Sequence, residues 1–273
     1  MYAMNGSYQT DGLTALSVRC LHLSVARSSD YLLIDISNSY AKFAFASKRR
    51  VSAPARIATS KLSTGVVSGF LRQREVRKVV VSSVVPTKNS AISRAARKKA
   101  EVIWLDWKVK LGVKIDYPKP RFIGADRLAN AAAVAELYGF PAIVVDFGTA
   151  VTFDIVSAHR SYVGGVIAPG LEAMTNFLYR RTALLPRLSL KEPRRAVGKS
   201  TIEAMLSGAV FGYRGLVREI LARIRAEQFP RKKVYVVATG GYARLIAGGL
   251  PEIGVIRPHL TLEGLRIVAN LND

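Results

Sequence analysis

Two similar stretches of the sequence most constrain how this chain can fold. The first reads YLLIDISNSYAKFAF (31–45) and the second reads AIVVDFGTAVTFDIV (142–156). In each, an apolar run with strand character reaches an aspartate, passes a short polar turn and continues as a second apolar run. One such stretch alone is an ordinary β-hairpin. Its recurrence, with Asp35 matched by Asp146, predicts two related halves that each open with the same hairpin.

The two turns carry residue types that suit a metal-bound phosphate. Backbone N–H groups in a tight turn can donate to phosphate oxygens, small side chains let a phosphate approach, and carboxylates hold cations. Ser37 corresponds to Gly148, and Asn38 to Thr149. Two such turns, contributed by facing halves, can enclose the phosphate tail of a nucleotide.

Apolar patterns along the rest of the chain alternate between strands and helices, which indicates an α/β architecture. Besides the two hairpins (31–36 with 40–46, and 142–147 with 150–156), strands are expected at 78–85, 102–105, 162–167 and 233–238. Helices are expected at 61–75, 88–100, 125–138, 170–180, 199–226, 241–249 and near 261–271. Three glycines in the long 199–226 helix are expected to permit close packing: Gly208, Gly212 and Gly215.

The net charge of +22 is large, and the basic residues occur in clusters such as Lys48-Arg49-Arg50 and Arg231-Lys232-Lys233. Such clusters can neutralise nucleic-acid phosphates, but no zinc finger, RNA-recognition aromatic signature or basic-region zipper accompanies them. We therefore favour a solvated basic surface over specific nucleic-acid binding. No apolar run approaches the length of a membrane span, and the single Cys20 fits a reducing cytoplasm.

Short motifs from residue 31 to the end, in a fixed order, resemble the type III pantothenate kinases of the acetate kinase, sugar kinase, Hsp70 and actin superfamily. The matching segments are DISNSYAK (35–42), SSVVP (82–86), GADR (124–127), DFGTAVTFD (146–154), GGVIAPG (164–170), TALLP (182–186), GKST (198–201), TGG (239–241) and LTLEGL (260–265). The resemblance implies two ribonuclease H-like halves with a nucleotide cleft between them. The halves would be residues 31–124 and 125–273, preceded by an N-terminal extension at 1–30.

The resemblance also implies a reaction, namely ATP-dependent phosphorylation of pantothenate as the first step of coenzyme A synthesis, in a cytoplasmic homodimer. Asp126 matches the general base. The residues implied to contact pantothenate are Tyr117, Gly124, Ala125, Asp126, Arg127 and Thr182. Those implied to bind ATP are Asp35, Ile36, Ser37, Asn38, Ser39, Tyr40, Ala41, Lys42 and Thr149. Asp35 would lie close to the Mg²⁺-nucleotide, and Asp146 would bind a monovalent cation, K⁺ or NH₄⁺.

These residue types fit phosphoryl transfer, which depends mainly on positioning and charge neutralisation. A carboxylate such as Asp126 is needed within hydrogen-bond reach of the accepting hydroxyl. The planar donors of Arg127 suit the carboxylate of pantothenate. A simpler interpretation of Asp126-Arg127 is a helix N-terminus, where the helix dipole favours an aspartate. The whole set of motifs favours the functional interpretation.

The first turn departs from the family pattern Asp-x-Gly-Asn-Thr, because Ser37 replaces the glycine and Ser39 the threonine. A β-carbon at residue 37 predicts weakened binding of ATP. An alternative function is therefore a non-catalytic, regulatory relative of the Bvg accessory factor type that binds nucleotide or nucleic acid. A further alternative is a phosphotransferase of the same superfamily with another acceptor, but Tyr117 and GADR, which would face the acceptor, speak against it.

Overall fold

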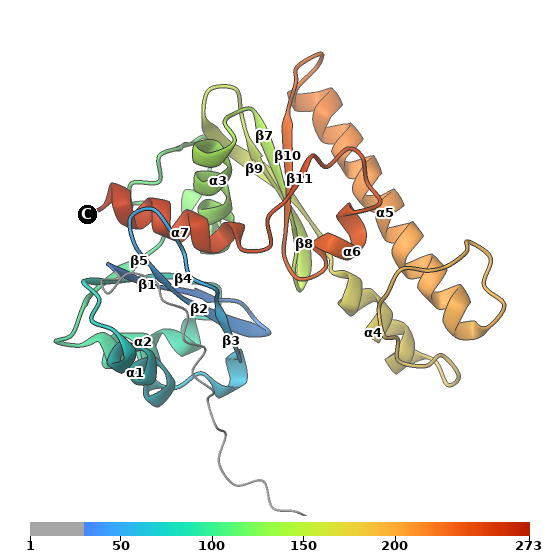
Figure 1. The fold of residues 1–273 in the computed structure, drawn as a ribbon. Helices are drawn as coiled ribbons and strands as arrows, with labels where there is room; N and C mark the ends of the chain where they lie inside the picture. The colour runs from blue at the N-terminus through green and yellow to red at the C-terminus, as the bar shows by residue number, and fades with distance from the viewer. Residues whose placement is uncertain (1–29) are drawn as a thin grey trace, which may run out of the picture.

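The computed structural model describes residues 30–273, which form two β-sheets with the same strand order (Figure 1). The first sheet has the order β3 (Ala55–Ala58), β2 (Tyr40–Ala46), β1 (Tyr31–Ile36), β4 (Lys78–Ser83), β5 (Glu101–Trp104). The second has the order β9 (Ser161–Pro169), β8 (Ala150–Val156), β7 (Ala142–Phe147), β10 (Tyr235–Thr239), β11 (Val255–Ile256), with β6 (Lys114–Ile115) added beside β9. The predicted extension, apart from residue 30, lies outside the described residues.

The pairing of the strands confirms the predicted repeat. In each half three consecutive strands form an antiparallel meander. A fourth strand pairs in parallel with the first strand of the meander, and a fifth pairs in parallel with the fourth. The predicted hairpin strands have the expected bounds, since β1, β2, β7 and β8 begin and end at the predicted residues. The sequence analysis missed β3, β6 and β11, which have 4, 2 and 2 residues and are too short to show an alternating pattern.

Helices occupy equivalent places in the two halves. They are α1 (Thr64–Gln73), α2 (Pro86–Ala96), α3 (Ala125–Leu137), α4 (Leu171–Arg181), α5 (Thr201–Gln228), α6 (Ala243–Ala247) and α7 (Leu260–Leu271). Short 3₁₀ turns lie at Thr59–Lys61 and Pro120–Phe122. All seven helices were expected, although α6 is shorter than predicted. Within residues 30–273, no helix combines the length and the apolar character that a membrane crossing requires.

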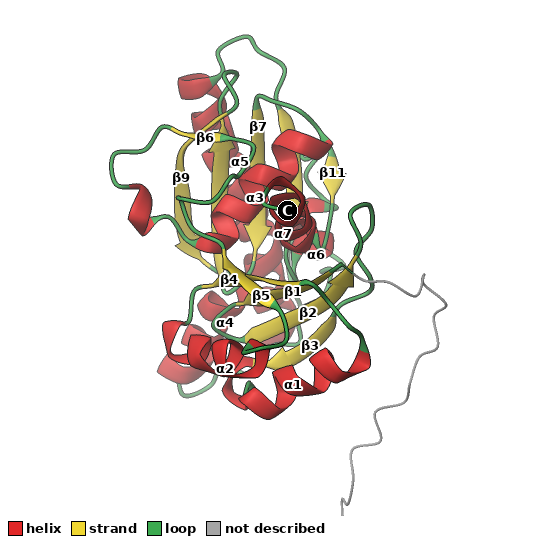
Figure 2. Cartoon of the chain, turned by 90° about the vertical axis from the view of Figure 1, so that its left-hand side faces the viewer, coloured by secondary structure: helices red, strands yellow, loops and turns green. Residues whose placement is uncertain are grey.

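Two helices, α3 and α7, lie between the sheets and join them (Figures 1 and 2). Helix α3 packs on β7 and β8 of the second sheet and also contacts β4 of the first, whereas α7 packs on β1 and β4 of the first sheet. One apolar core therefore contains Leu33 of the first sheet, Val144 of the second, and Leu128 and Leu265 of the two helices. The helices cross closely, because a Cβ added at Gly264 would lie 2.0 Å from the carbonyl oxygen of Ala129.

Strand alternation decides which way the repeated aspartates point. In β1, Leu32, Ile34 and Ile36 pack on the outer side with α1 and α2, whereas Tyr31 and Leu33 belong to the core shared with α3 and α7. Because side chains alternate along a strand, Asp35 shares the inner face with Leu33. The same pattern in β7 places Asp146 on the inner face with Val144. Both carboxylates therefore face the layer between the sheets.

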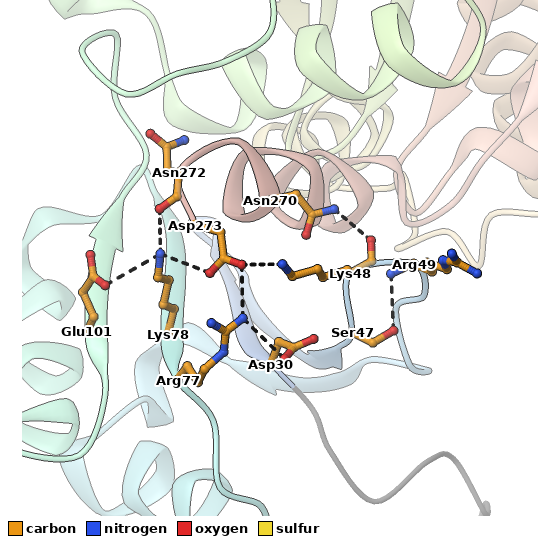
Figure 3. A network of polar contacts seen from close by, with 10 residues as sticks. All are labelled: Asp30, Ser47, Lys48, Arg49, Arg77, Lys78, Glu101, Asn270, Asn272 and Asp273. Carbon is orange, nitrogen blue, oxygen red and sulfur yellow. Dashed lines mark hydrogen bonds and ion pairs between the residues drawn. The ribbon is translucent and has the colours of Figure 1, made fainter.

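The end of α7 is fixed to the first sheet by a group of charged contacts (Figure 3). The carboxylate of Asp273 lies 2.7 Å from Nζ of Lys48, 3.2 Å from Arg77 Nη2 and 3.4 Å from Nζ of Lys78. Lys78 also donates to the carbonyl oxygen of Asn272 at 2.6 Å. These cations lower the pKa of Asp273 well below its usual range. The contacts hold this end of α7 against the first sheet.

The long helix α5 differs from expectation at its glycines. A Cβ added at Gly208, Gly212 or Gly215 would meet nothing within 4 Å, so the close packing expected of them is wrong within residues 30–273. The helix begins at the GKST motif, where Ser200 Oγ accepts the backbone N–H of Glu203 at 3.2 Å and Glu203 accepts that of Lys199 at 2.7 Å. This motif is therefore a helix cap of the capping-box kind.

The crossing of α3 and α7 generates a stability prediction. Gly264→Ala should destabilise the protein by about 1–3 kcal/mol, because the added methyl group meets the backbone of α3 and both helices must shift. Gly69→Ala in α1 is the matched control, since a Cβ there meets nothing within 4 Å. The control should be neutral or stabilising by up to about 1 kcal/mol. Urea unfolding measures both; equal midpoints would contradict the close crossing.

Candidate active site

The two hairpin turns lie side by side; they are residues 37–39, between β1 and β2, and residues 148–149, between β7 and β8. The hydroxyl of Ser39 in the first turn lies 3.2 Å from the hydroxyl of Thr149 in the second, a hydrogen bond between residues from different halves. The turns are not identical. In the first, the last strand pair is Ile36 with Ala41, and in the second it is Phe147 with Val151, so the first turn is one residue longer.

The first turn accommodates Ser37 without the backbone conformation that favours glycine. Ser37 does not have a positive φ, and neither does its counterpart Gly148. Thr59 braces the turn, because its hydroxyl donates to the Ser37 carbonyl at 2.6 Å and its N–H to the Ser39 carbonyl at 3.1 Å. The N–H groups of Asn38 and Ser39 donate to no protein acceptor within residues 30–273. Reduced ATP affinity stays a prediction, but backbone strain is not a reason for it.

Asp35, the residue before the last of β1, has a nearly buried carboxylate and is 2% exposed. Its Oδ2 lies 3.5 Å from Nζ of Lys42, which is opposite it in the antiparallel pair, while Oδ1 is buried without a hydrogen-bond partner. The neighbouring Ile36 and Ala41 have buried side chains, so only their backbone can face the turn. Tyr40 is exposed, and the Arg56 guanidinium lies over its ring, with Arg56 Cζ 3.4 Å from the centroid of the Tyr40 ring.

Hydrogen bonds from α3 and α7, the two helices between the sheets, position the Asp146 side chain. Its Oδ2 accepts a hydrogen bond from Asn130 of α3 at 3.3 Å, and Asn130 in turn accepts one from Thr261 of α7 at 2.9 Å. Gly240, with φ +93°, closes over the carboxylate, and a Cβ there would lie 2.5 Å from Asp146 Oδ1. Burial raises the pKa of Asp146, and the nearby Lys42 opposes this.

Asp126 stands in the first turn of α3, where the sequence analysis placed it. Its Oδ1 accepts a hydrogen bond from the backbone N–H of Arg127 at 2.9 Å. Gly124 precedes the helix, and a Cβ added at this glycine would lie only 2.5 Å from the same Asp126 oxygen. Burial raises the pKa of Asp126 to about 7, with further contributions from Asp35, Asp146 and Asp154. Three other carboxylates therefore lie within electrostatic reach of this one. Ala125, beside it, is buried.

Arg127 is oriented by a carboxylate that the sequence analysis did not identify. Its Nε donates to Asp154 Oδ1 at 2.6 Å, and the Tyr162 hydroxyl donates to the same oxygen at 3.5 Å. Burial raises the pKa of the fully buried Asp154 to about 6, while Arg127 opposes the rise. The Nη2 donor of Arg127 and Oδ2 of Asp154 are buried without partners. The sequence did contain a signal, because Asp154 of DFGTAVTFD is an aspartate among the apolar residues of an expected strand.

Two adjacent glycines of β9 make room for this arrangement. A Cβ at Gly165 would lie 2.4 Å from Arg127 Nη2 and 1.9 Å from the Phe153 carbonyl oxygen. Gly164 has φ +131° and lies against the Tyr117 ring. Tyr117 packs edge-on against Tyr162, with ring centroids 6.2 Å apart. The GGVIAPG motif is thereby explained by the space that Arg127 and Tyr117 require.

Most predicted site residues thus lie near one another: the two turns are hydrogen-bonded to each other, and Asp126 at the start of α3 lies within electrostatic reach of Asp35 and Asp146. Thr182 is the exception. It ends α4, which lies apart from α3 in Figure 1, and its hydroxyl bonds only within its own segment, to Leu178 and Leu185. Within residues 30–273 no three His, Cys, Asp or Glu side chains are grouped to hold a metal ion by themselves. The unpartnered Oδ1 of Asp35 nevertheless suits a cation that phosphates also bind.

The raised pKa of Asp126 generates a prediction about stability. Its folded-state pKa of about 7 exceeds the ordinary 3.8, so the folded protein holds this proton more tightly than the unfolded chain. The stability contribution is present at low pH and is lost as the pH rises toward 7. Asp126→Asn should therefore raise the Tm at pH 8 by about 2 °C or more, and by less at pH 5. The exposed Asp116→Asn is the control; equal effects of both variants at pH 8 would contradict the burial argument.

Comparison with known proteins agrees with this geometry. The family model described as type III pantothenate kinase matches residues 31–223. A type III pantothenate kinase of Akkermansia muciniphila is 49% identical over 89% of this chain and 99% of its own length. One of Methylacidiphilum infernorum is 41% identical, covering 88% of each chain.

Solved structures show the same fold at lower identity. A Sinorhizobium meliloti protein assigned as a 2-dehydro-3-deoxygalactonokinase aligns with TM-score 0.58 and 15% identity over 88% of this chain and 96% of its own. A Campylobacter jejuni protein assigned to the Baf family of transcriptional activators aligns with TM-score 0.54 and 20% identity, covering 88% and 98%. The predicted fold class, of the actin, Hsp70 and sugar kinase type, is confirmed. By its match over most of its length and its identity to these relatives, the chain belongs to the type III pantothenate kinase family.

Proposed function

We propose that this chain transfers the γ-phosphate of ATP to the primary hydroxyl of pantothenate, with Asp126 as the general base. The observation that carries the proposal is the position of Asp126 in the first turn of α3, within electrostatic reach of Asp35 and Asp146, whose two hairpin turns are hydrogen-bonded to each other. Burial also raises the pKa of Asp126 to about 7. A carboxylate of ordinary acidity is a weak base, whereas one with a pKa near the working pH is both deprotonated and able to accept a proton. Family membership supports the choice of substrate.

The transfer requires little covalent chemistry from the protein. The hydroxyl oxygen of pantothenate attacks the γ-phosphorus as the bond from phosphorus to the ADP oxygen breaks. Asp126 accepts the hydroxyl proton and releases it to solvent after the products, ADP and 4′-phosphopantothenate, have left. The protein contributes orientation, exclusion of water and the position of this proton acceptor.

The phosphate chain would lie between the two turns. The unengaged N–H groups of Asn38 and Ser39 and the hydroxyls of Ser39 and Thr149 are its donors. Asp35 would hold Mg²⁺ together with the nucleotide, and Asp146 would hold the monovalent cation, K⁺ or NH₄⁺. These cations supply neutralisation of phosphate charge in a site that otherwise gathers carboxylates.

Pantothenate would bind on the side of Arg127 and Tyr117. The unpartnered Nη2 of Arg127 can donate to the pantothenate carboxylate, while Asp154 fixes the guanidinium through Nε. Gly124 and Ala125 would supply backbone contacts at the start of α3. Tyr117, which is 38% exposed, forms the solvent side of this region.

A homodimer would complete the pocket and give Thr182 its expected role. The surface of α4 and the following loop exposes Met174, Phe177, Leu178, Tyr179 and Leu184, and the last is 89% exposed. The three glycines of α5 that meet nothing within the chain offer a flat neighbouring surface. An exposed apolar surface of this extent is typical of a protein interface. Thr182 lies at its edge, where it would face the substrate of a partner protomer.

The kinase proposal predicts a pH-dependent activity that Asp126 controls. ADP release that requires both ATP and pantothenate should have a kcat/KM that rises with pH and levels off above about 7, because the base must be deprotonated. Asp126→Asn should lower kcat by about 10²–10⁴-fold. Asp116→Asn should keep normal turnover. Folded protein without turnover at millimolar ATP would instead favour a regulatory relative.

The dimer proposal predicts that one apolar side chain of α4 is required for both assembly and activity. Phe177, which is 60% exposed, is the test position, and Phe177→Lys should convert a dimer into monomers in light-scattering measurements. The variant should also raise the KM for pantothenate, because Thr182 would leave the pocket. Leu137→Lys, at an exposed leucine of α3, is the control and should stay dimeric. A monomeric wild-type protein with full activity would contradict the proposal.

A further inference from the structure

A second concave site lies in the segment that joins the two halves. Residues 108–114, from the β5–β6 connection to the start of β6, meet the turn between β8 and β9 and line an open cavity of about 500 Å³. Small-molecule sites typically have volumes of about 300–1,000 Å³. The lining includes five basic or imidazole side chains and no acidic one: Lys108, Lys110, Lys114, His159 and Arg160.

This cavity is separate from the candidate active site. Thr149 of the second phosphate turn immediately precedes β8, whereas His159 and Arg160 follow its other end. The strand has 7 residues, and at about 3.3 Å per residue its ends are about 20 Å apart. In Figure 2, β6 and β9 mark this edge of the second sheet.

Within the described residues, the protein neutralises only one of the four cationic side chains in the cavity, Arg160, which pairs with Glu136 at 2.8 Å. Lys108, Lys110 and Lys114 form no ion pair with a carboxylate of residues 30–273. The nearby basic residues at the end of α7 differ, because Lys48 and Lys78 pair with Asp273 (Figure 3). Clustered cations that lack counter-ions raise the local concentration of anions.

The backbone that carries these lysines is held in place. Asn272 clamps Lys110, accepting its N–H at 3.1 Å and donating to its carbonyl at 2.9 Å. The Lys108 N–H donates to Asp106 at 2.7 Å, and the Lys114 N–H donates to the Arg160 carbonyl at 3.0 Å. A ligand would therefore bind a loop that is already largely ordered, and the entropy cost of ordering this loop on binding would be small.

Several donors in this loop have no acceptor. The N–H groups of Leu111, Gly112 and Val113 donate to no protein group in the described part of the chain. Gly112 has φ +73°, the left-handed conformation that occurs in anion-binding turns. Arg160 Nη2 is engaged by Glu136 at 2.8 Å, but its buried Nε has no partner. Cationic side chains and free N–H groups together match phosphate oxygens.

We infer that this cavity binds a small molecule carrying two or more phosphate groups. A single carboxylate would neutralise only one of the three unpaired lysines, whereas a phosphate chain can contact several of them and the loop N–H groups together. Two sources share this chemistry, a nucleoside polyphosphate and an inorganic polyphosphate. The inference stands independently of the kinase proposal, because no residue of the active site takes part in it.

Calorimetric titration of the full chain with tripolyphosphate, without divalent cations, tests the inference. The triple variant Lys108→Gln/Lys110→Gln/Lys114→Gln should bind about tenfold more weakly or worse, because three unpaired charges are removed. The matched control is Arg97→Gln/Lys98→Gln/Lys99→Gln, which removes the same charge from an exposed segment after α2 without ion pairs. The control should bind as the wild type does. Trp107, whose ring centroid is 5.5 Å from Lys108 Nζ, gives a second, fluorescent readout.

Comparing ligands separates the two sources. If ATP and tripolyphosphate lose the same affinity in the lysine variant, the cavity recognises the phosphate chain alone. If ATP binds the wild type much more tightly than tripolyphosphate and loses that advantage in the variant, the nucleoside is recognised as well. Equal weakening in both triple variants, or no tripolyphosphate binding by a wild type with a normal melting curve, would overturn the inference. Pantothenate-dependent turnover should stay unchanged in both variants.

Discussion

The packing of α3 against α7 is the contact on which the rest of the structure depends. Helix α3 covers the second sheet and α7 covers the first, so the two sheets share one core only while these helices cross closely. The absence of a side chain at Gly264 permits that approach. Because Asp126 lies in the first turn of α3, the same contact decides where the proposed base stands relative to both phosphate turns. Fold and chemistry therefore rest on one interface.

The site concentrates negative charge in a chain whose net charge is strongly positive. Asp35, Asp126, Asp146 and Asp154 come from three strands and one helix, and the pKa of each of the last three is raised by burial. Lys42 and Arg127 compensate only part of this charge, and carboxylate oxygens of Asp35 and Asp154 remain unpartnered. Buried carboxylates without partners raise the free energy of the folded protein, and cations or hydrogen-bond donors of a bound substrate would offset this cost. Binding of a charged ligand is thereby favoured at the expense of stability.

The sequence predicted what local patterns determine. The apolar runs of β1 and β7 defined both hairpins and the aspartates near their ends, and the order of short motifs identified the family. It did not reveal Asn130 or Asp154, because each acts through a partner far along the chain, on another element. The glycines of α5 were misjudged for a related reason, since a helix sequence does not say whether a small residue faces its own chain or a partner. Thr182 remains a prediction for the same reason, because its expected neighbours belong to a second protomer.

The two halves share a topology but their matched aspartates have different partners. Asp35 faces a cation, Lys42, across its hairpin, whereas Asp146 accepts from a neutral amide, Asn130, backed by Thr261. The first turn is also one residue longer and leaves two N–H groups unengaged. Under the proposed function, both turns contact the phosphates, the first supplies more of the donors, and Asp146 of the second hairpin would hold the monovalent cation. A duplicated hairpin can take on two tasks in this way, because only the turn and one residue on a neighbouring element need to differ.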